Sequence, residues 1–137
     1  MHCIASEKYP TGLMPLTLVF VVDDEPRITE TLVQILRMRD YEAVGFTDPL
    51  LALAATADAK PALLLSDYMM PEMNGLSLAE QVVEQCPDCK VLMITGTISH
   101  AQNHPAAGRF EILQKPVSPL DLLEKIAAKL GNPLKKS

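Results

Sequence analysis

Short apolar runs alternate with segments of helical periodicity, and this alternation constrains the fold more than any other feature of the sequence. The runs span residues 16–22, 41–46, 62–66, 90–95 and 110–113. Each is nearly continuous in apolar residues, as expected of a parallel strand that is covered on both faces. Between them, apolar residues recur every three or four positions, which is typical of amphipathic helices. The pattern predicts an α/β fold in which five βα units, (βα)5, form a five-stranded parallel sheet.

Capping residues and prolines mark where the helices begin and end. Helices are expected from Pro26 to near Asp40, from Asp48-Pro49 to about Ala59, after Gly75, and from Ser118-Pro119 to Gly131. Apolar positions at helical spacing predict which side chains face the core. They are Ile28, Leu32, Ile35 and Leu36 in the first helix, Leu76, Ala79, Val82 and Val83 in the third, and Leu120, Leu123, Ala127 and Leu130 in the last.

Residues 97–108 break the pattern. They show no apolar stripe, and Pro105 excludes a regular helix interior. His100 and His104 are four residues apart and could hold a metal if they shared one helix. A solvated loop is the favoured interpretation of this segment.

The two ends of the chain also lack periodicity. Residues 1–15 contain two prolines and one glycine, so we expect a flexible extension in which Met14 is a candidate natural start. A length of 137 residues suits one domain, which we place at residues 16–131, followed by a short tail at 132–137.

Charge and hydropathy exclude two classes of partner. The net charge of −5 provides no basic surface for nucleic acid. The apolar stretch 13–22 is shorter than the roughly 20 residues that cross a bilayer, and it leads directly into an acidic pair. We expect a cytoplasmic protein with no direct contact with nucleic acid or membrane.

Three cysteines are present, and only Cys86 and Cys89 have a suggestive spacing. A C-x-x-C pair could be half of a zinc site or a redox pair, but no second pair follows. Reduced thiols in a loop are the favoured interpretation.

Polar side chains gather where the predicted strands end, and ligands bind at that edge of an open α/β sheet. Asp23 and Asp24 follow the first strand and Asp67 the third. Three converging carboxylates repel one another unless a cation lies among them. Because all the donors are oxygens, Mg²⁺ is the expected ion.

Thr95 ends the fourth strand, and Lys115 follows the fifth. A hydroxyl and an ammonium that face a metal-carboxylate site suit a phosphoryl group, whose charge is spread over three oxygens. Taken singly, each residue has a plainer interpretation: the acidic pair could cap a helix, Thr95 could end a strand, and Asp67 could belong to a turn.

Four motifs together resemble the receiver domain of bacterial response regulators. They are VDDEP at 22–26, LSDYMMPEMNG at 65–75, ITG at 94–96 and QKP at 114–116. The resemblance covers about residues 16–130 and implies a doubly wound, flavodoxin-like sheet with strand order 2-1-3-4-5. Four motifs in order, each at its own strand end, are far more specific than any one of them.

The resemblance also implies roles. Asp67 matches the phosphoacceptor, Asp23 and Asp24 the metal-binding pair, Met69 the residue whose backbone carbonyl completes the metal shell, Thr95 the switch hydroxyl and Lys115 the phosphate-binding lysine. It implies a cis bond before Pro116, phosphoryl transfer from a histidine of a sensor kinase or phosphotransfer protein, and slow hydrolysis afterwards. The downstream target stays unknown, and dimerisation upon phosphorylation stays open.

This sequence departs from the family pattern in two places. Ile112 stands where the family usually has an aromatic residue, and Phe110, two positions earlier, should share its sheet face. The segment 97–108 is weak for a helix that such domains often use for partners. In the family, the aromatic residue reorients as the threonine moves toward the phosphate. The resemblance therefore does not carry this switch over to a chain with Ile112.

Three other kinds of protein compete with this interpretation. The chain could be a receiver module from a hybrid kinase or a larger regulator, or a degenerate receiver that only binds proteins. An aspartate-nucleophile phosphatase would need an acid two residues after Asp67, where Met69 stands.

Overall fold

The structure, a computed structural model, describes residues 17–130. Five parallel strands form one sheet in the order β2-β1-β3-β4-β5, which confirms the predicted fold. The elements are β1 (Leu18–Val22), α2 (Pro26–Met38), β2 (Glu42–Phe46), α3 (Pro49–Ala55), β3 (Leu63–Asp67), α4 (Gly75–Gln85), β4 (Lys90–Thr95), α5 (Ile98–Gln102), β5 (Glu111–Gln114) and α6 (Pro119–Leu130). The expected extension at 1–15, with Cys3 and Met14, and the tail at 132–137 lie outside the described residues.

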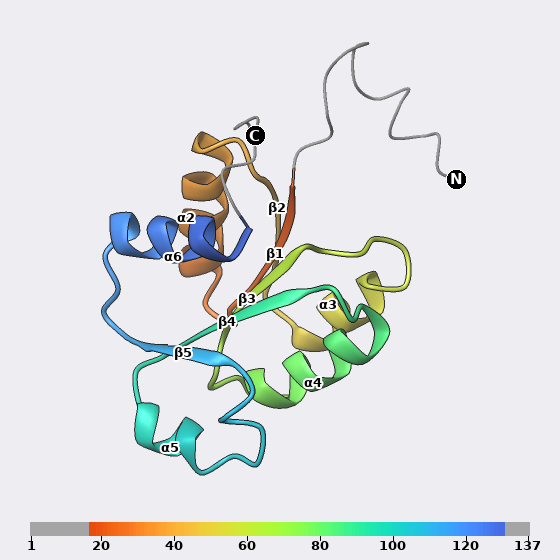
Figure 1. Cartoon of the computed structure of the whole chain (residues 1–137), viewed down its shortest axis with the longest axis vertical. Helices are drawn as coiled ribbons and strands as arrows, with labels where there is room; N and C mark the ends of the chain where they lie inside the picture. The colour runs from red at the N-terminus through yellow and green to blue at the C-terminus, as the bar shows by residue number, and fades with distance from the viewer. Residues whose placement is uncertain (1–16, 131–137) are drawn as a thin grey trace.

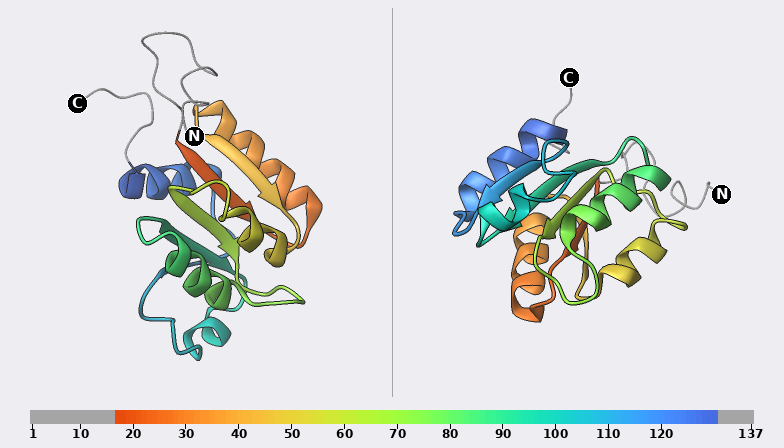
Figure 2. Two further views of the ribbon diagram at one scale, coloured as in Figure 1. Left: turned by 90° about the vertical axis from the view of Figure 1, so that its right-hand side faces the viewer. Right: turned by 90° about the horizontal axis from the view of Figure 1, so that it is seen from below.

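Helices cover both faces of the sheet (Figures 1 and 2). Helices α2 and α6 lie on one face, where Val33, Leu36 and Ile126 pack against alternate residues of the central strands. Helices α3 and α4 cover the other face, where Leu76 and Val82 join the core. Because β1 and β3 are apolar toward both layers, their ends are held rigidly, and the polar residues that follow them are held with them.

The core-facing stripe of α2 differs from the prediction. Thr29, Val33 and Leu36 are buried, whereas Ile28 is 38% exposed and Leu32 half-buried. Counting apolar residues misses Thr29 because its hydroxyl is paired inside the protein, donating to the carbonyl of Asp23 at 2.7 Å. A satisfied polar side chain therefore takes a core position, and the stripe is rotated by one residue.

Helix α6 is rotated in the opposite sense, by one residue toward its N-terminus. Leu122, Leu123 and Ile126 are buried, and Leu120, which was predicted to face inward, is 57% exposed. Leu120 stands in the first turn of the helix, and Ile126 takes the central core position instead. In α4 the predicted stripe is right except that Val83 is only half-buried. Helix α3 ends at Ala55, four residues before the predicted end, and a turn follows.

Strand β2 is an edge of the sheet, and Arg37 covers part of it. The Glu42 amide and the Phe46 carbonyl bond toward β1, so Ala43 and Gly45 direct their backbone groups outward. The Arg37 guanidinium donates to the Ala43 carbonyl through Nε at 3.2 Å and through a terminal nitrogen at 2.8 Å. One outward carbonyl of the edge is therefore already bonded within the chain.

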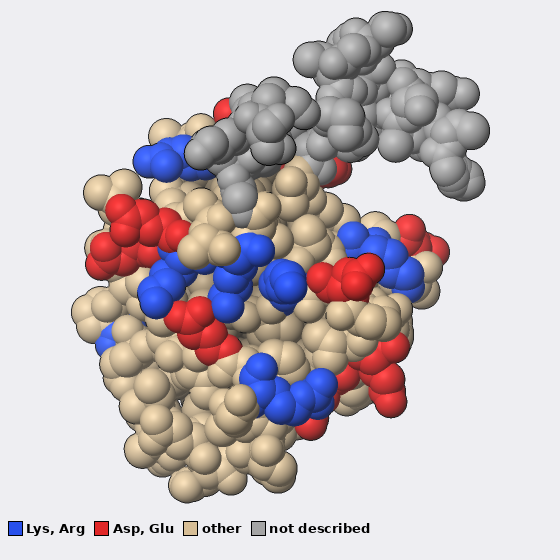
Figure 3. Space-filling model, viewed as in Figure 1, with Lys and Arg blue, Asp and Glu red and all other residues tan. Residues whose placement is uncertain are grey.

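The segment 97–108 contains the short helix α5, which the loop interpretation did not predict, and then a series of turns, which agrees with it. His100 is exposed on α5, but His104 lies beyond the end of α5 and is half-buried, so its interpretation as a solvated residue was wrong. No Lys, Arg, Asp or Glu occurs from Gly96 to Gly108. The corresponding end of the molecule in Figure 3 is free of charged side chains.

Cys86 and Cys89 are free thiols, and both are buried. Burial, the largest effect, raises the pKa of Cys89 to about 12, so that its thiol stays protonated at neutral pH. The two residues flank the turn between α4 and β4 and face inward, rather than forming an open loop. A buried, protonated thiol is a poor nucleophile and a poor metal ligand.

Candidate functional site

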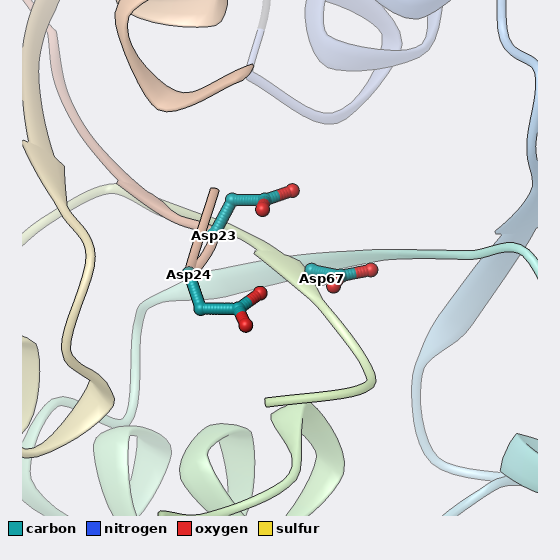
Figure 4. A group of neighbouring side chains, drawn as sticks. All are labelled: Asp23, Asp24 and Asp67. Carbon is teal, nitrogen blue, oxygen red and sulfur yellow. The ribbon is translucent and has the colours of Figure 1, made fainter. Parts of the chain in front are cut away.

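Three carboxylates meet at the carboxyl edge of the sheet (Figure 4). Asp23 and Asp24 follow β1, and Asp67 is the last residue of β3. One oxygen from each lies within 4.8 Å of the others. Within residues 17–130, this is the one group of three or more such side chains that converges in a way that could hold a metal.

Asp23 is fixed by its backbone and its side chain. Its amide donates to the Phe46 carbonyl at 3.1 Å, and its carbonyl accepts from the Thr29 hydroxyl. Its Oδ1 accepts from the Glu25 amide at 2.9 Å. Gly45 makes this arrangement possible, because a Cβ there would clash with the Thr29 side chain. The buried Asp23 therefore cannot swing away from Asp67.

Asp67 sits directly above the start of α4. The Tyr68 amide donates to the Ile94 carbonyl at 3.0 Å, and the Gly75 amide donates to the Tyr68 carbonyl at 2.8 Å. A Cβ on Gly75 would collide with the Asp67 carbonyl and the Met93 sulfur, so only glycine fits. The loop after Asp67 is therefore closed tightly against β3 and β4.

Lys115 provides the positive charge at the site. Its Nζ lies 3.2 Å from Asp67 Oδ1 and 3.8 Å from Asp23 Oδ2. Its amide donates to the Thr95 carbonyl at 2.7 Å, and the Lys115-Pro116 bond is cis, as the resemblance implied. The side chain thus reaches both buried carboxylates from the end of β5.

The electrostatics of the site favour an added cation. Burial is the largest effect on both Asp23 and Asp67, and it raises the pKa of each. Repulsion from a neighbouring aspartate adds to this rise, and attraction to Lys115 opposes it. Because one ammonium faces three carboxylates, the site keeps an excess of negative charge. A set made only of oxygen donors and in excess negative charge fits Mg²⁺.

Thr95 is fully buried at the end of β4, and its Oγ1 accepts from the Thr97 amide at 3.1 Å. Gln114 braces the same turn by donating from Nε2 to the Gly96 carbonyl at 2.8 Å. Met69 is 53% exposed, and with Asp24 and Asn74 it lines a depression of about 470 Å³ beside the carboxylates. The depression opens the acidic cluster to solvent and to small ions.

The structure brings together the side chains of Asp23, Asp24, Asp67 and Lys115, with Thr95 at the adjacent strand end. Ile112 and Phe110 both pack against the core on the α4 face, as predicted. Sequence reasoning missed the contact between Ser77 and His104, 27 residues apart, because no motif or period joins them.

A doubly wound parallel sheet with an acidic cluster and one lysine at its carboxyl edge defines a class of α/β proteins whose ligand site lies where the strands end. Comparison with known sequences gives the family. A sequence model of the response regulator receiver domain matches residues 19–127, and the chain belongs to that family.

Individual relatives agree. The chain is 31% identical over 110 residues to the response regulator receiver protein CpdR of Brucella abortus. The aligned region covers 79% of this chain and 92% of CpdR. Among longer curated relatives, the chain spans only 19% to 51% of their length.

Solved structures give the same result. A CheY-like receiver domain protein from Methanospirillum hungatei superposes with a TM-score of 0.76 at 33% identity, covering 84% of this chain and 94% of that one. The response regulator TrrA of Thermotoga maritima, solved in complex with Mg²⁺ and BeF, gives 0.74 at 27% identity, covering 83% and 99%. No helix within residues 17–130 is both long and apolar enough to cross a membrane.

Proposed function

We propose that this receiver domain accepts a phosphoryl group on Asp67 in a two-component pathway. The observation that carries the proposal is the contact of Asp67 with Lys115 at 3.2 Å inside a cluster of three carboxylates. An Asp67 oxygen attacks the phosphorus of a phosphohistidine, the P–N bond breaks as the O–P bond forms, and the imidazole leaves with its electron pair.

Asp23, Asp24, Asp67 and the backbone carbonyl of Met69 would hold Mg²⁺. The bound ion would offset the negative charge that three carboxylates and a phosphoryl group bring together. The fit rests on the donor set, on the raised pKa of Asp23 and Asp67, and on the open depression beside Asp24.

Lys115 and Thr95 would bind the other phosphoryl oxygens. Lys115 stands close enough to Asp67 to contact an oxygen added there. Thr95 Oγ1 accepts one hydrogen bond, from Thr97. Its hydroxyl proton can therefore be donated to a phosphoryl oxygen after rotation of the side chain.

The phosphoryl group should leave slowly. In the receiver family the positions of Met69, two residues after Asp67, and Thr97, two after Thr95, flank the path of the attacking water, and neither side chain is an acid or base near neutral pH. The domain is thus a phosphoacceptor with slow self-hydrolysis, not an enzyme acting on other substrates. Loss of the label within seconds would contradict this part of the proposal.

The partners proposed are a sensor histidine kinase or a histidine phosphotransfer protein, with a cytoplasmic location and no direct contact with nucleic acid or membrane. The receiver domain is placed at residues 16–131. Sedimentation before and after phosphorylation tests whether the domain forms a dimer in response.

The test is phosphorylation by a small phosphodonor. Wild type, Asp67→Asn and Asp88→Asn are each incubated with acetyl phosphate and Mg²⁺ and analysed by intact mass. Asp88 is an exposed carboxylate far from the site in sequence and serves as the matched control. Wild type and Asp88→Asn should gain one base-labile phosphoryl group, and Asp67→Asn none.

A degenerate receiver that acts only through protein binding is the second candidate, favoured only by Ile112 in place of an aromatic residue. If neither wild type nor Asp67→Asn gains a phosphoryl group from acetyl phosphate, the second candidate replaces the first. If both gain one equally, phosphorylation at Asp67 is refuted and the acceptor is another residue.

A further inference from the structure

Residues 97–109, which follow Thr95, are attached lightly to the domain. Their fully buried side chains are Ala101 and Ala106, and alanine removes little apolar area from water. Helix α5 has five residues, and its N-cap Thr97 makes no side-chain capping bond. With so little apolar burial, hydrogen bonds and ion pairs must hold much of this segment in position.

One of these contacts joins the segment to the start of α4. His104 Nε2 lies 3.1 Å from Ser77 Oγ. His104 Nδ1 accepts a hydrogen bond from the Ala106 amide at 3.0 Å, so Nδ1 carries no proton. In the neutral ring the proton is then on Nε2, which donates to the Ser77 hydroxyl. Both ring nitrogens are thus engaged.

Ser77 is in the first turn of α4, close in sequence to the loop that follows Asp67. Its amide donates to the side chain of the N-cap residue Asn74 at 2.8 Å. Residues 97–109 are therefore connected to both proposed site residues: to Thr95 through the Thr97 amide, and to the Asp67 loop through Ser77. In Figure 1 the chain after α5 passes beside the start of α4.

A second tether is more exposed. Arg109 lies 3.5 Å from Glu80, one helical turn beyond Ser77, and the two side chains are 55% and 40% exposed. An exposed ion pair of this kind contributes little to stability. The Ser77–His104 bond is shorter and part-buried, so it is the stronger restraint of the two.

We propose that the Ser77–His104 hydrogen bond is a latch that holds residues 97–109 in the unphosphorylated arrangement and opens when Thr95 turns to the phosphoryl group. The proposal rests on the proposed function of Asp67. When Thr95 Oγ1 rotates away, the Thr97 amide loses its acceptor, and the bond that tied the backbone at Thr97 to β4 no longer opposes a shift of this segment. His104 resists that shift, which makes it a positioning residue.

A latch that forms in one state only has a thermodynamic consequence. Removing it lowers the cost of reaching the other state, so a ligand that prefers the other state binds more tightly. A residue with a merely structural role would give unchanged or weaker binding on removal. The sign of the change in affinity therefore separates the two roles.

The experiment measures binding of beryllofluoride, a stand-in for the phosphoryl group, in the presence of Mg²⁺. Ser77→Ala removes the acceptor. His104→Asn keeps an acceptor for the Ala106 amide but cannot reach Ser77. Each should bind beryllofluoride about 3- to 10-fold more tightly than wild type, as expected for one net hydrogen bond. The double variant should gain no more than either single one.

Glu80→Gln is the matched control, because it breaks only the exposed tether to Arg109, and its affinity should equal that of wild type. In wild type, the ¹⁵N signal of His104 Nε2 should shift when beryllofluoride is added, and it should stay unchanged in Asp67→Asn. Equal or weaker binding by both Ser77→Ala and His104→Asn overturns the latch. Failure of wild type itself to bind beryllofluoride with Mg²⁺ instead overturns the proposed function of Asp67.

Discussion

The crossovers that follow β3 and β4 begin side by side at the same edge of the sheet, yet they are built very differently. After Asp67, the chain closes through Gly75 onto α4, an eleven-residue helix with Leu76, Leu78 and Val82 in the core. After Thr95, the chain forms the five-residue α5 and anchors itself with two alanines. One crossover is fixed by packing, and the other by a few hydrogen bonds.

The two crossovers therefore suit two different tasks: the first holds the carboxylate site in place, and the second can change position in response to a signal. The carboxylates must stay in place to bind a metal and a phosphoryl group, and tight packing around Asp23 and Asp67 provides that rigidity. A segment that changes position on a signal must instead have two arrangements of similar free energy. Residues 97–109 have the small buried surface that such a change requires.

The largest expected effect is on stability and concerns the β3–α4 crossover. Gly75→Ala should lower the free energy of unfolding by about 2–3 kcal/mol, because its Cβ would overlap the Asp67 carbonyl. Gly108→Ala should change it by less than about 0.5 kcal/mol, because a Cβ there meets nothing within 4 Å. Urea unfolding measures both. Equal losses would show that the two crossovers are equally tight.

Mg²⁺ should stabilise the acidic end of the sheet. At about 100 times its dissociation constant, the ion should raise the free energy of unfolding of wild type by about 2.7 kcal/mol. Asp24→Asn should lose most of this gain, and Asp88→Asn should keep it, because only Asp24 belongs to the carboxylate cluster. Thermal unfolding with and without Mg²⁺ tests this, and a gain of the same size in all three proteins would argue against the site.

Without metal, the half-buried carboxylate of Asp67 should lower the free energy of unfolding, and the loss should depend on pH. The pKa of Asp67 is raised above 3.8 in the folded protein, so the native state holds its proton to higher pH than the unfolded chain does. Wild type therefore loses stability as pH rises through this window, and Asp67→Asn loses less, because of the two carboxyl groups with a raised pKa it keeps only Asp23. At pH 7 the variant should therefore be more stable than wild type.

Urea unfolding between about pH 4.5 and 7.5 measures the difference between these two proteins. The advantage of Asp67→Asn should grow as pH rises, whereas Asp88→Asn should follow wild type throughout. An advantage that shrinks with rising pH would reverse the sign of the argument and would mean that Lys115 outweighs burial at this site.

The smallest effect belongs to the exposed tether of the β4–α5 crossover. Glu80→Gln should change the free energy of unfolding by less than about 0.5 kcal/mol, because the pair with Arg109 is more than a third exposed on both sides. Urea unfolding at low and high salt tests it. A loss above 1 kcal/mol, removed by salt, would show that this crossover is held more firmly than its packing suggests.

The fold could be predicted from the sequence because short apolar runs that alternate with helical segments are typical of buried parallel strands. The sequence also indicated most of the site, since Asp23 and Asp67 follow directly after such a run and Lys115 stands two residues after one. It misplaced the buried stripe of α2, where Thr29 is satisfied by a backbone carbonyl that only the folded chain provides. The role of His104 was missed for a similar reason, because its partner Ser77 is 27 residues away in the sequence and only the fold brings them together.

Arg37 has a consequence for assembly. A parallel sheet ends in unpaired backbone groups at its outer strand, and such groups attract strands from other chains. With the Ala43 carbonyl bonded twice by this guanidinium, an incoming strand would first have to displace an arginine. Self-association by strand addition at β2 is thereby disfavoured, and replacing Arg37 by leucine should make the protein more prone to form fibres.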